Sequence, residues 1–537
     1  AGCDCDARPP ADAARTAGPA AVLLELDGPM PQSAAASGLL GSGATTQRRF
    51  VELLERASRD LAVQEIVVHI VGPELGWARG REVSDAIARA ADAGKPLTCH
   101  LEAADNRTYW LAARACPKIV LAPAGGVDLV GLAAETIFAR RALDALGVRA
   151  EMLRVGRYKD AAESLTRDEM SPESLEATRG LLAELHRELV DGIAAGRELD
   201  DAAVEELLAS GPYDADQALE RGLVDEVRTL GRVLAPLARE HAGGVVEDYG
   251  AKPPEPLGLG EILEMLSGAP PPKPRPTEPR IALVNAVGPI LSGSGANELL
   301  AGMEVVRDGP LLLALDEAAR DESIRAVVLR VDSPGGSALA SDNIWAAVRD
   351  LAEVKPVVAS LGDVAASGGY YVASAATEVF ASPNTLTGSI GVLGGKLTLS
   401  EGLDEIGIST RTIEHSPRAG MASPFRPFTE EERAALTAYM RRAYDLFVDR
   451  VAAGRGLERA DVLAAAEGRV WSGAQALSRG LVTSSGGLHE AAERARELAG
   501  HAGAPLEVFP APKSFFEVLT ETLGPPPPAA GALALAR

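Results

Sequence analysis

The sequence predicts an α/β fold in which one domain is present twice, in tandem. The first observation is that short apolar segments bounded by Gly, Pro or Asp alternate with longer segments of helical periodicity, a pattern typical of βαβ units around a buried, largely parallel sheet. The second is that motifs of the first half return in the same order about 260 residues later. The length agrees, because 537 residues are enough for two substantial hydrophobic cores.

The internal repeat consists of pairs of matching segments. In chain order, residues 60–70 match 321–331, 94–97 match 354–357, 109–112 match 370–373, 194–197 match 452–455 and 218–224 match 476–482. Because the order never changes, we interpret the repeat as the duplication of a whole domain.

The repeat also sets the predicted boundaries. Between the two halves, nine prolines within residues 250–280 cannot continue a helix or a central strand, which indicates a linker. The predicted units are an N-terminal tether at residues 1–18, a first domain at 19–249, the Pro-rich linker at 250–280, a second domain at 281–510 and a C-terminal tail at 511–537.

Within each half, the expected elements follow in the same order. The apolar runs at residues 60–70 and 321–331 are expected to be strands, and the periodic segments at 81–93 and 342–354 are expected to be the helices that follow them. In the second half, another strand of β-branched residues then leads through small residues into a helix that opens at Ser367.

Charge and composition exclude several classes of function. Acidic residues outnumber basic ones 76 to 53, which gives a net charge of −23, and no basic face is evident. A nucleic-acid partner is therefore not expected. The seven histidines include no pair at i,i+4 and no carboxylate-supported cluster with metal-ligand spacing, so neither a metal nor a cofactor is expected. Four cysteines are too few for a disulfide framework, and we interpret Cys99 and Cys116, which lie in apolar runs, as buried thiols.

The start of the chain carries a candidate lipidation site. No segment reaches the roughly 18 consecutive apolar residues of a membrane-spanning helix. Ala1, Gly2 and Cys3 resemble the end of a bacterial lipoprotein signal, in which small residues precede a cysteine that is then acylated, and the polar, Pro-rich residues 4–10 suit a tether. We therefore expect an upstream segment to have been removed and Cys3 to be lipidated; the alternative is an ordinary trimmed terminus.

Ser367 is the first candidate for chemistry. It stands in Ala-Ala-Ser-Gly-Gly-Tyr-Tyr, where a strand turns into a helix, so its hydroxyl is expected near free backbone N–H groups and the positive end of the helix dipole. This setting suits an acyl-transfer nucleophile, because the same N–H groups can hold an oxyanion. The alternative is that Ser367 only caps the helix. A second Gly-rich turn at Gly335 and Gly336 also follows a strand and could supply another oxyanion donor, or be a simple tight turn.

A serine nucleophile needs a base, and no histidine lies in a recognisable catalytic setting. No Gly-x-Ser-x-Gly elbow occurs either. A lysine whose pKa is lowered by burial can replace histidine in this role. Lys159 follows an apolar strand in a chain that mostly uses Arg for positive charge, which makes it the candidate; the alternative is a solvated surface lysine.

Taken together, the motifs resemble a known family. They are Gly-Arg-Tyr-Lys-Asp-Ala-Ala-Glu at residues 156–163, Arg-Asp-Glu-Met-Ser-Pro at 167–172, Asp-Ser-Pro-Gly-Gly-Ser at 332–337, Ala-Ser-Gly-Gly-Tyr-Tyr at 366–371 and Leu-Thr-Gly-Ser-Ile-Gly-Val at 386–392. Over about residues 20–500, the chain is similar to the long, tandem-domain form of the bacterial signal peptide peptidase A (protease IV) family, peptidase family S49.

The resemblance implies a fold, an activity and a site. The fold would be a tandem pair of ClpP/crotonase-like domains, and the activity that of a membrane-bound serine protease that degrades cleaved signal peptides with a Ser/Lys dyad and no cofactor. By position in the motifs, the nucleophile falls on Ser367, the general base on Lys159, the serine that orients the lysine ammonium on Ser389, and the oxyanion donors on the backbone N–H of Gly368 and of the Gly335-Gly336 turn.

The repeat supports a single shared site independently of the family. Aligned through Tyr109 and Tyr370, the first-half counterpart of Ser367 is Asn106; aligned through Gly147 and Gly407, the second-half counterpart of Lys159 is Ala419. Each half therefore keeps one member of the dyad, and we expect one active site between the two halves.

Partners and alternatives follow from the same resemblance. We expect peptide substrates with small or apolar residues at the cut, a homo-oligomer that is a ring-like tetramer, and a place on the periplasmic side of the bacterial cell membrane. Members of the family usually carry an N-terminal hydrophobic anchor, so Cys3 or a removed segment would serve instead, or the protein would be soluble in the periplasm. Two other functions stay open: a crotonase-like acyl-CoA enzyme, and an inactive peptide-binding or membrane scaffold.

Overall fold

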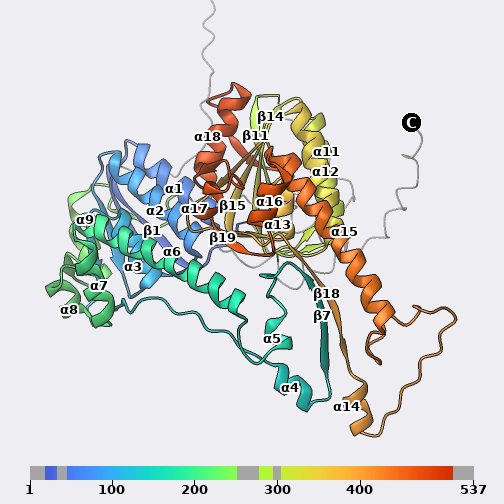
Figure 1. Ribbon diagram of the computed structural model, residues 1–537. Coiled ribbons are helices and arrows are strands. Elements are labelled where there is room, and N and C mark those ends of the chain that lie inside the picture. Colours follow the sequence, from blue (N-terminus) through green and yellow to red (C-terminus); the bar gives the residue numbers. More distant parts are fainter. Residues whose placement is uncertain (1–17, 33–44, 251–276, 294–303, 512–537) are drawn as a thin grey trace, which may run out of the picture.

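The computed structural model describes residues 18–32, 45–250, 277–293 and 304–511, and it shows two α/β halves that lie side by side (Figure 1). The predicted duplication and fold class are confirmed. The strands expected at residues 60–70 and 321–331 are β2 (Val63–Glu74) and β14 (Ile324–Ser333). The helices expected after them are α2 (Trp77–Asp92) and α12 (Ala338–Val354).

The first half is built on a parallel sheet in the order β10-β1-β2-β3-β5-β9. A small second sheet contains β4, β6 and β8. The strands are β1 (Ala20–Pro29), β2, β3 (Leu97–Leu101), β4 (Ala104–Asp105), β5 (Ile119–Leu121), β6 (Gly126–Asp128), β8 (Tyr213–Asp214), β9 (Glu226–Val227) and β10 (Val245–Val246). The helices are α1 (Gln47–Arg59), α2, α3 (Asn106–Ala115), α6 (Pro172–Arg197), α7 (Asp201–Ser210), α8 (Ala215–Glu220) and α9 (Leu230–Glu240).

The second half repeats this order. Its main sheet runs β19-β17-β15-β14-β11-β21, with β16 paired to β15 and β20. The strands are β11 (Arg280–Val287), β12 (Ile290–Leu291), β13 (Val306–Arg307), β14, β15 (Val357–Ala366), β16 (Glu378–Ala381), β17 (Leu386–Gly388), β19 (Val470–Ser472), β20 (Ser484–Ser485) and β21 (Leu506–Val508). The helices are α11 (Asp308–Arg320), α12, α13 (Gly368–Ala373), α15 (Glu430–Arg455), α16 (Arg459–Ala465), α17 (Gly473–Ser478) and α18 (Leu488–Ala499).

Matching side chains hold the two copies together in the same way. Tyr109 donates its hydroxyl proton to the carbonyl of Leu223 at 2.8 Å, and Tyr370 donates to the carbonyl of Leu481 at 2.8 Å. Both tyrosines are fully buried, and each hydroxyl therefore satisfies a polar group that would otherwise be stranded in the core. The repeat is thus a duplication of packing as well as of sequence.

Each sheet has a large core on one face and a smaller one on the other. In the first half, α1, α2, α3 and α6 cover the large core, and α9 covers the opposite face through Leu230, Leu234 and Leu237. In the second half, α11, α12, α13 and α15 cover the large core, and α18 covers the opposite face. Because both faces are buried, the central strands are mostly apolar rather than alternating, with a few buried polar side chains such as His100 and Arg330.

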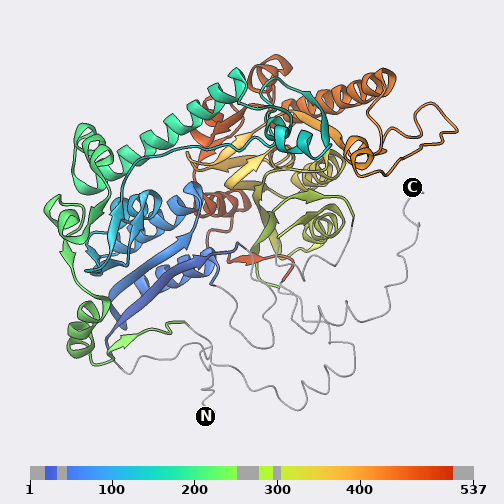
Figure 2. The same ribbon diagram turned by 90° about the horizontal axis from the view of Figure 1, so that it is seen from below.

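An arm from each half crosses to the other. Strand β7 (Arg149–Val155) belongs to the first half by sequence but pairs antiparallel with β18 (Val392–Thr398) over its whole length. Figure 1 shows the two strands side by side, away from both main sheets, with α4 (Arg140–Ala145), α5 (Glu163–Thr166) and α14 (Ser400–Glu405) nearby. The view from below, in Figure 2, shows the same crossing between the green and orange parts of the chain.

The halves also share a buried ion pair. Arg330 on β14 is 2% exposed, and its guanidinium donates to both carboxylate oxygens of Glu82 on α2, at 2.6 and 3.0 Å. A pair removed from water in this way needs both partners, because either charge left alone would be strongly destabilising. The contact therefore fixes how α2 of the first half lies against the second half.

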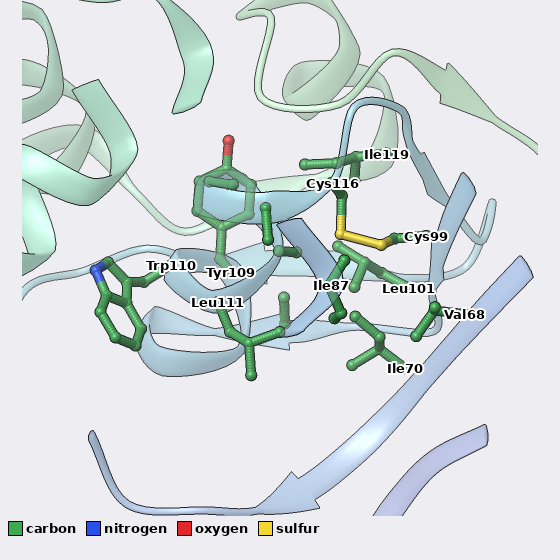
Figure 3. Close-up of a cluster of buried hydrophobic side chains, with 14 of the residues drawn as sticks. Val68, Ile70, Ile87, Cys99, Leu101, Tyr109, Trp110, Leu111, Cys116 and Ile119 are labelled. Atoms are coloured by element: carbon green, nitrogen blue, oxygen red, sulfur yellow. A yellow bond between two sulfur atoms is a disulfide. The ribbon is translucent and has the colours of Figure 1, made fainter. Parts of the chain in front are cut away.

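The structure corrects the interpretation of the two internal cysteines. Cys99 on β3 and Cys116 at the end of α3 form a disulfide rather than two thiols. Figure 3 shows this disulfide inside the first core, beside Leu101 and Ile119. The cysteines are 17 positions apart in the sequence, and an apolar run gives no sign of the partner. The packing of α3 on the sheet brings the two sulfur atoms together.

Several predicted segments fall wholly or mostly outside the described residues. These are the tether with Cys3, most of the Pro-rich linker and the C-terminal tail. The predicted domain boundaries at residues 19–249 and 281–510 stay predictions.

Candidate active site

The β7–β18 pairing positions Lys159 beside the second half. Val155, the last residue of β7, lies opposite Val392, the first residue of β18. Lys159 follows β7 by four residues and Ser389 precedes β18 by three, so an antiparallel pair places them at the same end of the arm. The backbone of the lysine loop is then fixed by the Tyr158 amide, which donates to the carbonyl of Glu467 at 2.8 Å.

The Lys159 ammonium lies between two serines. Its Nζ is 2.9 Å from Oγ of Ser367 and 2.9 Å from Oγ of Ser389, and it donates to the Ser389 carbonyl at 3.0 Å. The residue is 8% exposed. Burial lowers the pKa of Lys159 to about 8, against a partial opposing effect of the Asp160 carboxylate. About a tenth of the molecules therefore carry the uncharged amine at pH 7, and most of them do at pH 9; this is the form that accepts a proton.

Ser367 stands at the turn between β15 and α13. Its backbone has φ 53° and ψ −120°, which is a strained conformation for a residue with a side chain. The Ser367 amide donates to the carbonyl of Gly388 on β17 at 2.9 Å, which holds the turn in place. The conformation turns Oγ toward Lys159 instead of capping the helix, and no side-chain cap bond is present at this helix start. The helix-cap alternative for Ser367 therefore does not describe this structure.

Ser389 also has a left-handed backbone, with φ 52°. Its amide donates to the carbonyl of Arg469 at 2.7 Å, and this bond ties the turn after β17 to the segment before β19. As a result, both the hydroxyl and the carbonyl of Ser389 face Nζ of Lys159. The serine fixes the direction of the lysine amine.

The two Gly-rich turns meet at the site. Gly335 has φ 98°, and a Cβ at this position would lie 2.6 Å from the amide nitrogen of Gly368. Any side chain at Gly335 would therefore push the turn away from the start of α13. A Cβ on Gly368 would in turn lie 3.2 Å from the amide nitrogen of Gly336. The Gly335-Gly336 turn thus packs directly against the start of α13, where Gly368 follows Ser367.

The amides of this pocket are not equivalent. The Gly335 N–H donates to Oγ of Ser333 at 3.1 Å, so in this structure it is already occupied. Gly368 is the first residue of α13, where an amide has no acceptor within the helix, and no hydrogen bond within the described residues uses the Gly336 amide. Of the three glycines expected from the sequence, Gly336 and Gly368 are therefore the ones whose amides have no acceptor among the described residues.

The first half contains no second site at the matching place. Asn106, the counterpart of Ser367, accepts from the amides of Val130 and Gly131 at 3.1 Å each and donates to the carbonyl of Gly131 at 3.0 Å. Its amide side chain closes the turn that corresponds to the one carrying Ser389. The structure therefore assembles one Ser–Lys pair, from one residue of each half, as the repeat alignment predicts.

One part of the site lies outside every motif in the sequence. Glu467 and Gly468 pack against the loop that carries Lys159. The Glu467 carbonyl accepts from the Tyr158 amide, and a Cβ on Gly468 would lie 2.6 Å from the Lys159 amide nitrogen. These residues are more than 300 positions from Lys159 and belong to no motif. Only the tertiary contact identifies them.

Comparison with known proteins agrees with this arrangement. The family model "Peptidase family S49" matches residues 89–243, which contain Lys159, and residues 349–502, which contain Ser367 and Ser389. The chain is 31% identical over 451 residues to "Serine protease SPPA, chloroplastic" of Arabidopsis thaliana, covering 83% of this chain and 64% of that protein. It is 32% identical over 433 residues to "Protease 4" of Haemophilus influenzae, covering 78% of this chain and 67% of that protein.

"Protease 4" of Salmonella typhi is 32% identical over 437 residues, covering 78% of this chain and 66% of that protein. The chain thus spans about two thirds of the length of these relatives. Among solved structures, a ClpP1 mutant from Listeria monocytogenes matches 40% of the chain at 17% identity, with a TM-score of 0.24. The two matched segments of the family model cover more than half of the sequence, one in each half of the fold. The chain belongs to peptidase family S49.

Proposed function

We propose that this protein is a serine endopeptidase that uses a Ser/Lys dyad to degrade apolar peptides, cleaved signal peptides among them, at the membrane. The observation that carries the proposal is the 2.9 Å contact between Nζ of a buried Lys159 and Oγ of Ser367. The names of the relatives, a serine protease and two enzymes called Protease 4, support hydrolysis of peptide bonds. The resemblance of the motifs supports signal peptides as the substrate class.

The geometry supports the following reaction. The neutral amine of Lys159 accepts the Ser367 hydroxyl proton while Oγ bonds to the scissile carbonyl carbon. The carbonyl oxygen becomes an oxyanion that accepts from the amides of Gly336 and Gly368. The Lys159 ammonium then donates its proton to the leaving amine as the C–N bond breaks. Water next transfers a proton to the same lysine and adds to the acyl carbon, and collapse with return of that proton to Oγ releases the acid and Ser367.

Ser389 serves this reaction as a positioning residue. Its carbonyl can only accept, so it holds one N–H of Lys159 and directs the amine lone pair toward Ser367. The Ser389 hydroxyl also contacts Nζ of Lys159. It can accept from the ammonium and donate to the neutral amine, so the contact persists when the charge of the lysine changes.

The two alternative functions are less well supported. A crotonase-like acyl-CoA enzyme needs an oxyanion pocket but no nucleophile, whereas here a serine and a buried lysine face each other. An inactive scaffold would have no reason to keep a buried, strained Ser–Lys pair. The peptidase accounts for both features.

The pH dependence of the rate tests the role of Lys159. We expect kcat/KM for a fluorogenic apolar peptide to rise about tenfold per pH unit below a pKa of about 8 and to level off above it, because only the neutral amine accepts the serine proton. A profile of kcat/KM measured from pH 5.5 to 9.5 tests whether Lys159 is the base. A rate that is flat from pH 6 to 9, or a midpoint near 6.5 typical of histidine, would exclude Lys159 as the base.

The place of the protein in the cell is a further part of the proposal. We place it on the periplasmic side of the bacterial membrane, attached through an acylated Cys3 or through an anchor in a removed segment. None of the described helices has both the length and the apolar character needed to cross a bilayer. The Cys99–Cys116 disulfide supports an oxidising compartment.

Thiol labelling and mass spectrometry test this placement. In protein isolated from its native host and denatured without reductant, we expect maleimide to leave Cys99 and Cys116 unmodified, and to label both after reduction. Modification of both before reduction would contradict an oxidising compartment. The mass of the N-terminal peptide decides whether Cys3 carries two or more acyl chains, the number that stable attachment requires.

The oligomeric state is also proposed. A homo-oligomer, a tetramer by resemblance to the family, would cover apolar side chains that a single chain leaves in water. These side chains are concentrated near the β7–β18 pair, on the segments next to it. Ile137, Leu146, Ile406 and Ile413 are 84%, 67%, 71% and 90% exposed. Exposed apolar groups gathered in one region are typical of an interface.

A further inference from the structure

The first sheet brings together two histidines and two glutamates that the peptidase site does not use. Glu25 on β1 lies opposite His69 on β2, and His69 lies opposite His100 on β3. Glu102 follows His100 by two residues, and its side chain therefore points to the same face. Val68 and Ile70 point into the large core on the other face, as Figure 3 shows. The set His69, His100 and Glu102 is called the histidine cluster below.

The three side chains of the histidine cluster converge. Nε2 of His69 is 3.1 Å from Oε1 of Glu102, and Nδ1 of His100 is 3.9 Å from the same oxygen. One ligand atom from each residue lies within 4.8 Å of the others. A tetrahedral zinc site with bonds of about 2.0–2.1 Å has ligand atoms about 3.3 Å apart. Small rotations of His69 and of Glu102, which is 46% exposed, would close the difference.

His100 gives the second, independent observation. The residue is fully buried, and its Nε2–H donates to the carbonyl of Arg228 at 3.0 Å. Because a carbonyl can only accept, Nε2 carries the proton and Nδ1 of the neutral ring carries a lone pair. Burial lowers the pKa of His100, which favours this neutral ring. Nδ1 faces the other members of the cluster, yet within the described part of the chain it has no hydrogen-bond partner.

We propose that His69, His100 and Glu102 bind one divalent transition-metal ion, for which Zn²⁺ is the best fit. Two neutral imidazoles and one carboxylate form a donor set typical of zinc, whereas Ca²⁺ and Mg²⁺ prefer oxygen ligands. A fourth position would be open to water from the side of Glu102. The ion would replace the missing partner of His100 Nδ1.

Neighbouring groups would hold the ligands in the right orientation. The Arg228 carbonyl fixes the tautomer of His100, as an outer-shell acceptor does in known zinc sites. The carboxylate of Glu25 lies 4.0 Å from Nδ1 of His69, and a small rotation of this exposed side chain would let it accept the proton of that nitrogen while Nε2 binds the metal. A bound ion would join β2 to β3 and so stabilise the first half.

Metal content of the whole chain tests the proposal without reference to peptidase activity. Chelator-treated protein without an affinity tag, and with Cys3 and Cys5 replaced by Ser to remove their thiols, is mixed with zinc sulfate, desalted and analysed by mass spectrometry. We expect one zinc per chain. At free zinc a hundredfold above Kd, the unfolding temperature of the first half should rise by roughly 5–10 °C.

Two partly exposed ligands supply the informative variants, because His100 is buried and its replacement could prevent folding. Glu102→Gln and His69→Gln should each weaken zinc binding at least about tenfold and, at the same zinc concentration, reduce the thermal shift to about half or less. The matched control is His186→Gln, in which an exposed His–Glu contact of 2.8 Å to Glu205 is removed from the same half; it should bind zinc as the parent does. Failure of the parent to retain zinc, or equal retention by Glu102→Gln and His69→Gln, would overturn the proposal.

Discussion

Replacing Ser367 with Ala is expected to lower kcat/KM for an apolar fluorogenic peptide by at least about 10³-fold, the loss typical of removing a serine nucleophile. The replacement removes the only atom that can form the acyl-enzyme, and the oxyanion amides alone leave a small residual rate. The folded structure should persist, because within the described part of the chain the Ser367 hydroxyl makes no hydrogen bond other than the one to Lys159. Hydrolysis followed at pH 9, where the lysine is neutral, gives the clearest comparison.

The control for this variant is Ser478→Ala. Ser478 is exposed on α17 in the same half; its hydroxyl donates to the carbonyl of Gln475 at 2.8 Å and accepts from the exposed Arg479 guanidinium at 3.2 Å. Its rate and unfolding temperature should equal those of the parent. If Ser367→Ala keeps more than about a tenth of the parent's rate while its fold is intact, another residue is the nucleophile.

Replacing Lys159 with Met should have an effect on the rate of similar size, of about 10³-fold or more, because no other base is in contact with Ser367 among the described residues. Met has a similar length and apolar volume, so it can occupy the buried space without a charge. The same change should increase the free energy of unfolding at pH 7 by roughly 1–3 kcal/mol, since a pKa lowered from 10.5 to about 8 means that the fold disfavours the ammonium.

Unfolding as a function of pH separates this explanation from a general packing effect. Between pH 8 and 10.5 the unfolded lysine holds its proton and the folded one does not, so the free energy of unfolding of the parent should rise with pH through this window. In Lys159→Met, that contribution to the rise should be absent. Lys118→Met, at an exposed lysine 2.8 Å from Glu226, is the control and should keep both the rise and the activity. A Lys159→Met protein that retains activity would remove the lysine from the mechanism.

The sequence was most informative where chemistry and backbone are local. Ser367, Gly368 and the Gly335-Gly336 turn stand in short motifs whose conformation depends on adjacent residues, and the structure places them together. The absence of a serine at Asn106 likewise predicted a single site. The repeat was visible because its elements keep their order in both halves.

The sequence was least informative where neighbouring strands or distant segments meet. His69 and His100 are 31 positions apart and share a face only because β2 pairs with β3 in one register, which no periodicity reveals. The Cys99–Cys116 bond depends in the same way on how α3 packs on the sheet. The Gly335 amide is likewise occupied by a hydrogen bond to Oγ of Ser333, which the Gly-Gly motif does not reveal.

The crossing of β7 to β18 has a consequence for timing. Lys159 leaves the ribosome 208 residues before Ser367, and β18 follows later still. At roughly 5–20 residues per second, synthesis leaves the lysine without its serine for roughly 10–40 s. Until β18 has been made and has paired with β7, the lysine lacks both its burial and its reaction partner. If the proposed Ser/Lys mechanism holds, a nascent chain cannot cut itself or its neighbours, and hydrolysis begins only when the whole molecule has folded.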